Sequence, residues 1–361
     1  MSNKTLLLTL DFPPNKGGVA RYLGALAEYF SDRLFVIAPP TDQSETPHTF
    51  SLFHQPLLCR YAWPRWLCSV WILWKKRKDY TQVLVSHLLP LGTAAWTASW
   101  FTRKPYLLVL HGMDFRLALC NPYKRLITRI VLSQATCVIV NSDALAKEVQ
   151  SHFTVKHLEV VYPCVDPVFL KDHLKENRSS TTLRLLTVSR LVSRKGHALV
   201  LQALAQLKKE GLLIEYAIYG DGPEEQTLKQ FVIAEQLEEN VHFYSCTTDE
   251  QILEAYRHAD LFVMPVLDDQ QDKEGFGMVY IEAAAQGLPA IATRMSGVDE
   301  AVIDQETGIL IPSGDVNALC EAIKDLFFHP DKRLAMGERA KQRVRSEFVA
   351  DKQFKKLASF L

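Results

Sequence analysis

The chain has 361 residues, of which 48% are hydrophobic and 23% are charged, and its 41 Lys and Arg balance its 41 Asp and Glu. That composition is ordinary for a soluble globular protein, and the length is natural for two domains. No uninterrupted apolar run reaches the roughly 18 residues that a membrane-spanning helix needs, so the sequence does not predict such a helix.

The charges are unevenly distributed along the chain. Residues 1–165 contain 18 Lys and Arg against 10 Asp and Glu, a net charge of +8, whereas residues 166–361 contain 23 against 31, a net charge of −8. The basic front half therefore favours an anionic partner, of which an anionic membrane surface is one candidate. It has no recognised nucleic-acid-binding motif, which disfavours a nucleic-acid partner.

The seven cysteines are scattered, and none forms a C-x-x-C pair. In a chain of this size, such a set predicts reduced, buried thiols in a cytosolic protein. The N-terminal apolar run is too short for a secretory signal peptide and lacks its cleavage pattern. We therefore expect a cytoplasmic protein, either free or peripheral on the inner face of the cell membrane.

The first predicted unit is a strand at 6–10, a loop containing Gly17 and Gly18, and a helix whose apolar residues recur at helical spacing. Strand, glycine loop and helix in this order are typical of a Rossmann-like domain, but the loop is not the G-x-G-x-x-G of a dinucleotide site. The chain then predicts a strand at 34–38 and a proline-rich, polar loop over 39–56.

Residues 61–78 combine four tryptophans with a terminal basic cluster. Two interpretations stay open for this stretch. It is either an interfacial helix that docks on a membrane, or a core helix whose basic end complements its own dipole.

Further strands are predicted at 82–86, 106–110 and 137–141. The second of these leads into His111-Gly-Met-Asp114, and side chains at the carboxyl end of a strand lie where open α/β sheets bind ligands. The following Asn-Ser-Asp sequence at 141–143 is expected to cap a helix, which is a structural role.

A second β-α pattern begins after a polar linker at 171–182. Its first strand, at 183–189, is followed by Arg190 and Lys195, which flank the start of a helix. Arginine binds phosphate in a bidentate manner and lysine adds a point charge, so this pair predicts an anion site. Arg194 is expected to face solvent.

Two more strands are predicted at 215–219 and 241–244. The G-x-G-P sequence after the first is interpreted as a structural turn. Tyr244 ends the second strand, where packing against its neighbours is one interpretation of its role.

The stretch on which the functional interpretation depends follows an apolar strand at 261–264 and a polar loop at 268–273. It contains Glu274, a Gly-Phe-Gly turn (Gly275, Phe276, Gly277) and Glu282 one turn inside a helix. Glycines and the helix start suit a diphosphate, whereas carboxylates accept hydrogen bonds from hydroxyl groups. A nucleotide diphosphate sugar offers both kinds of group.

Glu274 and Glu282, with seven residues between them, resemble the E-x7-E motif of the family 4 retaining glycosyltransferases. The resemblance extends to Arg190, Lys195 and the His111-Gly-Met-Asp114 sequence. It implies an α/β protein of the GT-B fold, in which two Rossmann-like domains with parallel sheets face each other across a cleft. It also implies domains at 1–166 and 167–345, with a C-terminal helix at 346–361 that crosses back to the first domain.

The same resemblance implies the role of each site residue. Catalysis would involve His111, Arg190, Lys195 and Glu274. The nucleotide sugar would be bound by Gly17, Gly18, Arg190, Lys195, Tyr244, Glu274, Gly275, Phe276, Gly277 and Glu282, and Asp114 would lie towards the acceptor. In particular, Glu274 would hold the sugar hydroxyls and Glu282 the ribose.

The implied activity is that of a retaining, metal-independent hexosyltransferase without a cofactor. It would transfer a sugar, from GDP-mannose or else from a UDP-sugar, to a hydroxyl of a glycan or lipid-linked acceptor in cell-surface polysaccharide or glycolipid synthesis. Two alternatives stay open: a sugar-nucleotide-binding protein without transferase activity, and a sugar-nucleotide epimerase of the same fold.

Overall fold

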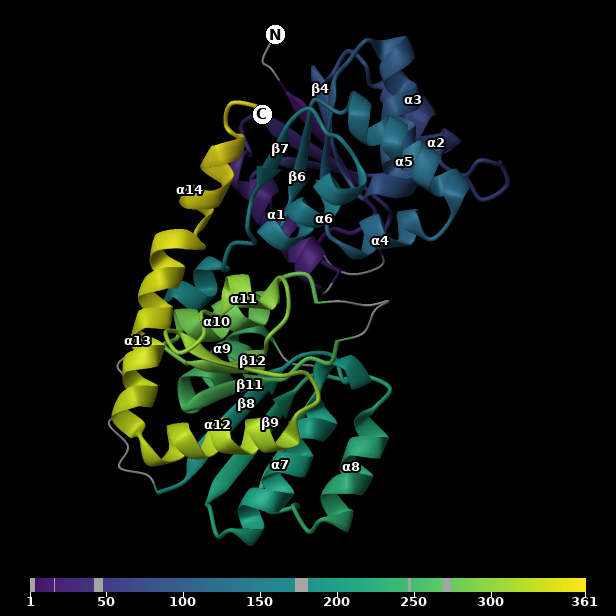
Figure 1. The fold of residues 1–361 in the computed structure, drawn as a ribbon. Helices are drawn as coiled ribbons and strands as arrows, with labels where there is room; N and C mark the ends of the chain where they lie inside the picture. The colour runs from purple at the N-terminus through teal and green to yellow at the C-terminus, as the bar shows by residue number, and fades with distance from the viewer. Residues whose placement is uncertain (1–3, 16, 42–47, 173–180, 246–247, 269–273) are drawn as a thin grey trace. The chain divides into compact units, whose positions relative to one another are not determined.

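The computed structural model of the chain describes residues 4–15, 17–41, 48–172, 181–245, 248–268 and 274–361. The chain forms two compact units (Figure 1). The first comprises Met1–Cys164 together with Ala350–Leu361, and the second comprises Val165–Val349.

The first unit is built on a parallel sheet. Its described residues supply seven strands in the order β3-β2-β1-β4-β5-β6-β7. The strands are β1 (Thr5–Leu8), β2 (Leu34–Ala38), β3 (Ser51–His54), β4 (Gln82–Ser86), β5 (Tyr106–Leu110), β6 (Cys137–Val140) and β7 (Leu158–Val160). The helices are α1 (Gly18–Tyr29), α2 (Leu67–Lys75), a short helical segment Leu88–Gly92, α3 (Thr93–Thr102), α4 (Met113–Leu119), α5 (Pro122–Gln134), α6 (Asp143–His152), α14 (Ala350–Gln353) and a 3-10 turn Phe354–Leu357.

Alternation of side chains along the central strand explains how this sheet is covered. Leu6 and Leu8 of β1 point to one face, where they join a core that includes Ile72 of α2. Leu7 points to the other face and packs in a second core with Leu23 of α1. Because both faces are buried, the strand is apolar throughout, as is usual in parallel sheets.

The second unit repeats this plan. Counting the described residues alone, it has six parallel strands in the order β10-β9-β8-β11-β12-β13. The strands are β8 (Leu183–Val188), β9 (Ile214–Tyr219), β10 (Val241–Tyr244), β11 (Leu261–Met264), β12 (Ala290–Thr293) and β13 (Gly308–Ile311). The helices are α7 (His197–Lys209), α8 (Glu225–Ala234), α9 (Asp249–His258), α10 (Met278–Ala285), α11 (Val298–Ala301), α12 (Val316–Phe328) and α13 (Pro330–Glu347), with 3-10 turns at Pro167–Leu170 and Ser193–Lys195.

In each sheet the strand order reverses once, between β1 and β4 and between β8 and β11. Open parallel sheets bind ligands at such switch points, outside the carboxyl ends of the strands. The predicted fold class, α/β with two Rossmann-like domains, is therefore confirmed. The predicted linker 171–182 lies mostly outside the described residues, as does the loop 268–273 apart from Asp268.

The C-terminal segment belongs partly to each unit. Phe348 packs on Phe276 in the second unit, with ring centroids 5.4 Å apart. Phe354 packs on Tyr22 in the first unit at 5.6 Å, and Gln82 donates a hydrogen bond to the carbonyl oxygen of Phe360 at 2.5 Å. Of the segment 346–361, residues 350–361 are thus part of the first unit.

The prediction of a loop over 39–56 is wrong for its last part. Residues 51–54 form β3, which pairs in parallel with β2. Its side chains are exposed or half-buried in alternation, as befits an edge strand. The run Ser-Leu-Phe-His is too short and too mixed for its period to stand out from the polar residues before it.

The prediction of reduced, buried thiols is wrong for two cysteines and wrong about the burial of a third, and Cys246 lies outside the described residues. Cys59 and Cys68 form a disulfide, and Cys120 is free but exposed, whereas Cys137, Cys164 and Cys320 are free and buried. The disulfide closes a loop in which the Cys59 amide donates to the carbonyl oxygen of Arg65 at 2.7 Å. A separation of nine residues is not a recognisable pairing pattern, so the sequence alone did not indicate this loop closure.

The interpretation of 61–78 as a core helix is wrong for its tryptophans. In α2 the buried residues are Ser69, Ile72 and Leu73. Trp71 and Trp74 instead lie on the outer face and are exposed. Among the described helices, none combines the length and the apolar composition needed to cross a bilayer.

Candidate functional site

The switch point of the second sheet brings two of the predicted segments together. The loop after β8 carries Arg190 and Lys195, and the segment after β11 leads to Glu274. The two main chains touch, because the Leu267 amide donates to the carbonyl oxygen of Arg194 at 2.7 Å. Gly196 has a φ of 76°, and a β-carbon there would lie 2.0 Å from the Pro265 carbonyl oxygen, so this contact requires glycine.

Glu274 is held by two cations from the facing loop. Its Oε2 accepts a hydrogen bond from Lys195 Nζ at 2.5 Å and another from Arg194 Nη1 at 2.7 Å. The three side chains are between 10% and 14% exposed. Burial by itself would raise the pKa of Glu274, but the charges of Lys195 and Arg194 outweigh it and hold the pKa below its ordinary value. Glu274 is therefore ionised at neutral pH.

Arg194 does not face solvent, contrary to the sequence prediction. Its guanidinium lies in the same enclosed cluster as Lys195 and Glu274. Arg190, by contrast, lies exposed just beyond the end of β8. The cluster therefore contains two cations around one carboxylate, an arrangement with a net positive charge beside the start of α7.

In the Gly-Phe-Gly turn after Glu274, the main chain lies beside the cluster of Arg194, Lys195 and Glu274, whereas the Phe276 ring points into the core. Phe276 is buried and packs on Phe348. Gly275 lies directly against Gly297, where a β-carbon would come within 2.3 Å of the Gly275 carbonyl oxygen. Gly277 precedes the first residue of α10. Backbone amides at a helix start are groups that bind anions.

Glu282 lies inside α10 and is almost fully buried. Its Oε2 accepts a hydrogen bond from the hydroxyl of Tyr256 in α9 at 3.1 Å. A neighbouring hydroxyl, that of Tyr280, donates to the carbonyl oxygen of Met264 at 2.6 Å and so fixes α10 against β11. Glu282 is thus hydrogen-bonded within the second unit, and its contact with a ribose stays a prediction.

Tyr244 forms an aromatic pair with Tyr219. Their rings stack with centroids 4.5 Å apart and an interplanar angle of 18°. The two residues end the adjacent strands β10 and β9. Tyr244 is 43% exposed, so it combines packing on one side with access to solvent. Both interpretations of Tyr244 from the sequence are therefore compatible with its position.

A buried polar chain beneath the cation loop was not foreseen from the sequence. His197 Nε2 lies 2.9 Å from Ser189 Oγ, and its Nδ1 lies 3.3 Å from the Tyr216 hydroxyl. That hydroxyl is 2.8 Å from Thr187 Oγ1, which donates in turn to the carbonyl oxygen of Val263. Burial lowers the pKa of His197 to about 4, so the ring is neutral at neutral pH. The sequence feature that could have indicated this polar chain is a histidine that directly follows a glycine at a helix start.

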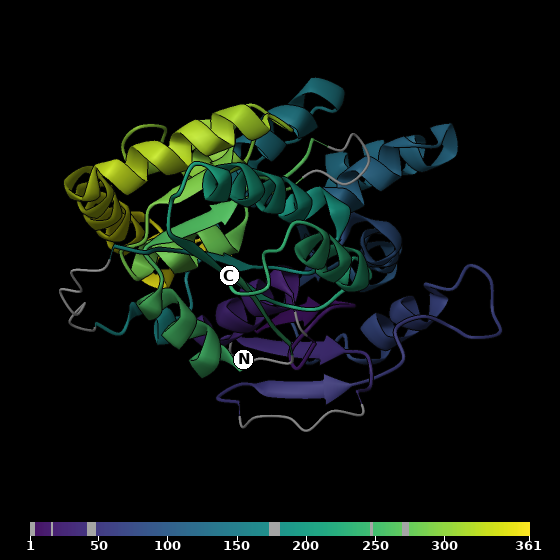
Figure 2. The ribbon, with the colours of Figure 1, turned by 90° about the horizontal axis from the view of Figure 1, so that it is seen from below.

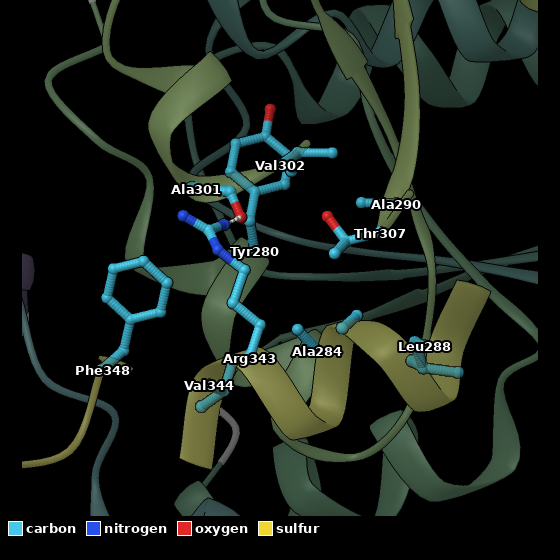
Figure 3. A pocket seen from close by; sticks show the side chains of 11 residues that line it. Tyr280, Ala284, Leu288, Ala290, Ala301, Val302, Thr307, Arg343, Val344 and Phe348 are labelled. Carbon is cyan, nitrogen blue, oxygen red and sulfur yellow. Dashed lines mark hydrogen bonds between the residues drawn. The ribbon is translucent and has the colours of Figure 1, made fainter. Parts of the chain in front are cut away.

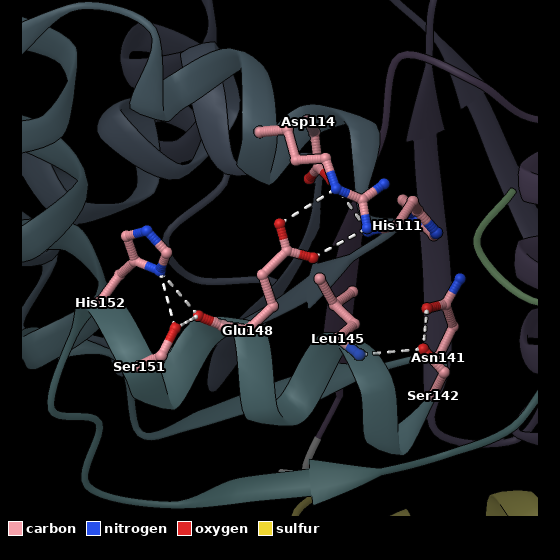
Figure 4. A network of polar contacts seen from close by, with 9 residues as sticks. His111, Asp114, Asn141, Ser142, Leu145, Glu148, Ser151 and His152 are labelled. Carbon is pink, nitrogen blue, oxygen red and sulfur yellow. Dashed lines mark hydrogen bonds and ion pairs between the residues drawn. The ribbon is translucent and has the colours of Figure 1, made fainter. Parts of the chain in front are cut away.

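In the first unit, His111 directly follows β5 and Asp114 lies in the first turn of α4 (Figure 4). His111 Nε2 is 2.8 Å from Ser86 Oγ at the end of β4. Asp114 accepts hydrogen bonds from the amides of Leu88 at 3.0 Å and His111 at 2.9 Å. Burial lowers the pKa of His111 to about 4. Asp114 therefore has a structural task, which joins the ends of the two strands, and its acceptor-side role stays a prediction.

The predicted helix cap after β6 is confirmed. Ser142 Oγ accepts a hydrogen bond from the Leu145 amide at 3.2 Å. Farther along α6, Glu148 accepts two hydrogen bonds from Arg116 of α4, at 2.8 and 3.0 Å. Gly17 and Gly18 lie exposed at the start of α1, at the switch point of this sheet.

A small cavity in the second unit is lined by none of the site residues predicted from the sequence (Figure 3). Its volume is about 10 Å³, which is room for about one water molecule. It is lined mainly by apolar residues, with Tyr280, Arg343 and Phe348 around it, and Arg343 donates to the carbonyl oxygen of Ala301 at 3.0 Å. It is too small for a nucleotide sugar. Within the described residues, no group of three or more His, Cys, Asp or Glu side chains is placed to hold a metal ion.

Comparison with known families gives two consecutive matches along the chain. The family model described as Glycosyltransferase Family 4 matches residues 16–169. The model described as Glycosyl transferases group 1 matches residues 169–343. The GDP-mannose-dependent monoacylated alpha-(1-6)-phosphatidylinositol monomannoside mannosyltransferase of Corynebacterium glutamicum is 26% identical to the chain, and the alignment covers 100% of the chain and 98% of that protein.

Solved structures resemble the whole chain. Sucrose-phosphate synthase from Thermosynechococcus elongatus has a TM-score of 0.82 at 20% identity and covers 99% of this chain and 98% of its own. Anabaena Alr3699/HepE in complex with UDP also has a TM-score of 0.82 at 20% identity, with 99% of each chain covered. At this level of identity, the similarity shows a shared fold.

Proposed function

Because the chain belongs to glycosyltransferase family 4 and has the GT-B fold, we propose that it transfers a sugar from a nucleotide diphosphate sugar to an acceptor hydroxyl with retention of the anomeric configuration. The observation that carries this proposal is the cluster of Arg194, Lys195 and Glu274 at the switch point of the second sheet. It puts an ionised carboxylate and buried cations beside two helix starts.

The diphosphate of the donor is assigned to the positive part of this cluster. Lys195 has three N–H donors, of which Glu274 takes one, and exposed Arg190 offers a fork-shaped guanidinium nearby in the loop. The amides of Gly275 and Gly277 at the start of α10 add neutral donors. Together these groups would bind the two phosphates.

The remaining parts of the donor are assigned to hydroxyl and ring contacts. Glu274 would accept hydrogen bonds from the sugar hydroxyls, and Glu282 from the ribose. Tyr244 would stack on the base through the face that Tyr219 leaves open. In the first unit, Gly17, Gly18 and His111 are proposed donor contacts and Asp114 an acceptor contact, as the family resemblance implies.

The proposed chemistry needs no covalent enzyme intermediate. The bond between the anomeric carbon and the diphosphate oxygen breaks, and the anomeric carbon forms a bond with the acceptor oxygen on the same face. The acceptor proton passes to the departing phosphate oxygen. Arg190, Lys195 and the helix starts would stabilise the negative charge that grows on the leaving group. Neutral His111 would orient the sugar as a hydrogen-bonding group rather than as a cation.

For the donor we propose GDP-mannose, with a UDP-sugar as the second choice. The Corynebacterium relative is GDP-mannose-dependent by name, and another structure of Alr3699/HepE is a complex with UDP-glucose. The acceptor is proposed to be a hydroxyl of a glycan or lipid-linked glycan, in cytoplasmic synthesis of cell-surface polysaccharide or glycolipid.

The test is release of nucleoside diphosphate from a panel of GDP-, UDP- and ADP-sugars, with and without lipid and polysaccharide extracts. Acceptor-dependent release with one donor, and loss of that release in Glu274→Gln but not in the exposed control Glu321→Gln, is expected. Conversion of the donor without acceptor would indicate an epimerase instead. Donor binding without any turnover would indicate a binding protein.

A further inference from the structure

The loop before α2 presents large aromatic rings to solvent. Tyr61 is 90% exposed and Trp63 is 86% exposed. The loop projects from the first unit (Figures 1 and 2) and is closed at its base by the Cys59–Cys68 disulfide. In the part of the chain that the structure describes, both rings are therefore left almost entirely open to solvent.

The outer face of α2 continues this aromatic character. Leu67, Trp71 and Trp74 recur at helical spacing and are 40%, 57% and 48% exposed. The helix therefore has apolar residues on both faces, whereas a surface helix of a globular protein has a polar outer face. We call Tyr61, Trp63, Leu67, Trp71 and Trp74 the aromatic surface.

Cations surround the aromatic surface. Between Glu45 and Asp114 the sequence contains one acidic residue, Asp79, so the surroundings are strongly basic. Lys75 Nζ lies 4.9 Å from the Trp71 ring centroid, and Arg77 lies 4.7 Å from that of Trp74. The cations of the loop and helix are Arg60, Arg65, Lys75, Lys76, Arg77 and Lys78. The neighbouring helix α3 ends in two more exposed rings, Trp100 and Phe101, followed by Arg103 and Lys104.

We propose that the aromatic surface docks the protein on an anionic lipid bilayer. Tryptophan and tyrosine are the side chains that settle at the boundary between headgroups and acyl chains, since each has an apolar body and a polar edge. Lysine and arginine beside them bind the anionic headgroups. The loop and α2 together supply aromatic and basic side chains. Tyr61 and Trp63, at the projecting end of the loop, would enter the lipid first.

Charge decides between a bilayer and a second copy of this chain. A two-fold contact through the aromatic surface would bring two sets of six cations against each other with no facing carboxylates except Asp79, which already pairs with Lys76 at 3.7 Å. An anionic bilayer neutralises the same cations. The docking does not depend on the proposed sugar transfer, because it uses none of the donor-site residues.

The sequence offers a direct probe of this surface. All six tryptophans lie between residues 63 and 100, so intrinsic tryptophan fluorescence reports on this region alone. Addition of vesicles of phosphatidylcholine and phosphatidylglycerol should shift the emission to shorter wavelength. Brominated lipid should quench it. Vesicles of phosphatidylcholine alone should have a much smaller effect, and high salt should reverse the binding.

Co-sedimentation of the full chain with the same vesicles tests which residues are responsible. The variant Trp63→Ser/Trp71→Ser should bind the phosphatidylglycerol vesicles about tenfold or more weakly. Arg60→Gln/Lys78→Gln should bind more weakly and show a smaller salt dependence. The matched control Ile233→Ser/Phe328→Ser, which removes residues that are 62% and 63% exposed in the second unit, should bind as the wild type does.

Three results would overturn the docking. One is absence of both sedimentation and an emission shift at low salt. A second is full vesicle binding by the Trp63→Ser/Trp71→Ser variant with an unchanged thermal unfolding curve. The third is a concentration-dependent dimer in sedimentation velocity that this variant abolishes, which would assign the aromatic surface to a second copy. Nucleoside diphosphate release, measured on the same samples, separates this outcome from failure of the proposed function.

Discussion

Lys195 and Glu274 form a 2.5 Å ion pair between the loops that follow β8 and β11. Both are proposed donor contacts, and they neutralise each other before any donor arrives. A diphosphate that binds the remaining N–H donors of Lys195 competes with Glu274 for the positive charge of Lys195, and Glu274 then becomes more available to sugar hydroxyls. Substitution of Glu274 and substitution of Lys195 are therefore expected to have different effects on the affinity for nucleoside diphosphate.

Substitution Glu274→Gln is expected to lower sugar transfer about a hundredfold or more, because the sugar loses its charged hydrogen-bond acceptor. The affinity for bare nucleoside diphosphate should stay equal or rise, since Lys195 and Arg194 lose a competing anion. Isothermal titration with GDP and UDP, together with initial rates, measures both quantities. A parallel loss of diphosphate affinity and transfer would contradict the division of roles.

Substitution Lys195→Gln is expected to weaken nucleoside diphosphate binding about tenfold or more, because a buried cation at the phosphates is lost. Binding of the nucleoside without phosphates should change little. The matched control is Lys209→Gln at the exposed end of α7, which should leave both affinities unchanged. Equal loss for nucleoside and nucleoside diphosphate would place Lys195 outside the phosphate site.

Tyr244→Ser tests the nucleobase assignment. Loss of a stacking ring should weaken nucleoside diphosphate binding by about 1–3 kcal/mol and leave pyrophosphate binding unchanged. Ile233→Ser, a similarly exposed residue of the same unit, serves as the control. If pyrophosphate and nucleoside diphosphate are affected alike, the ring acts on the loop structure rather than on the base.

The buried His197 predicts how stability depends on pH. Burial lowers its pKa from 6.5 to about 4 in the folded chain. Between these values the unfolded chain takes up a proton that the folded chain does not, so the free energy of unfolding falls as the pH falls through this window. The slope contributed by this one group approaches about 1.4 kcal/mol per pH unit. Above pH 6.5 it contributes none.

Urea unfolding at several pH values between 6.5 and 4.5 measures this slope, and His197→Gln should make it shallower. His111 contributes with the same sign, because burial lowers its pKa to about 4 as well. The double variant with His111→Gln should therefore be flatter still. An unchanged slope in both variants would mean that neither ring is held neutral.

Much of the fold could be predicted from apolar runs. The bounds of β2, β4, β5 and β11 agree with the runs identified in the sequence, because these buried strands are mainly apolar and end where polar loops begin. The bounds of β10 also agree, although it is an edge strand with two exposed residues. The edge strand β3 was missed for the converse reason. Its half-exposed residues carry no continuous apolar signal.

Candidate site residues could be predicted where their type and their position in a loop indicate the role. Contacts with side chains from distant segments of the chain could not be predicted. Lys195 and Glu274 were singled out separately, but their ion pair depends on β8 and β11 lying side by side. Arg194 was expected to face solvent because a cation in a loop normally does, and Glu274, eighty residues away in the sequence, reverses that expectation. The Cys59–Cys68 disulfide was missed because it depends on a local loop closure.

Two glycines allow close contacts between the main chains of neighbouring loops, and these contacts limit how the donor preference of this protein can change. Gly196 lies on the Pro265 carbonyl and Gly297 on that of Gly275, so the loops after β8, β11 and β12 touch without intervening side chains. A residue inserted into any one of them would push the others apart. New sugar preferences are therefore more accessible through replacement of individual side chains on a fixed frame than through changes of loop length, and directed evolution of this protein should be designed on that basis.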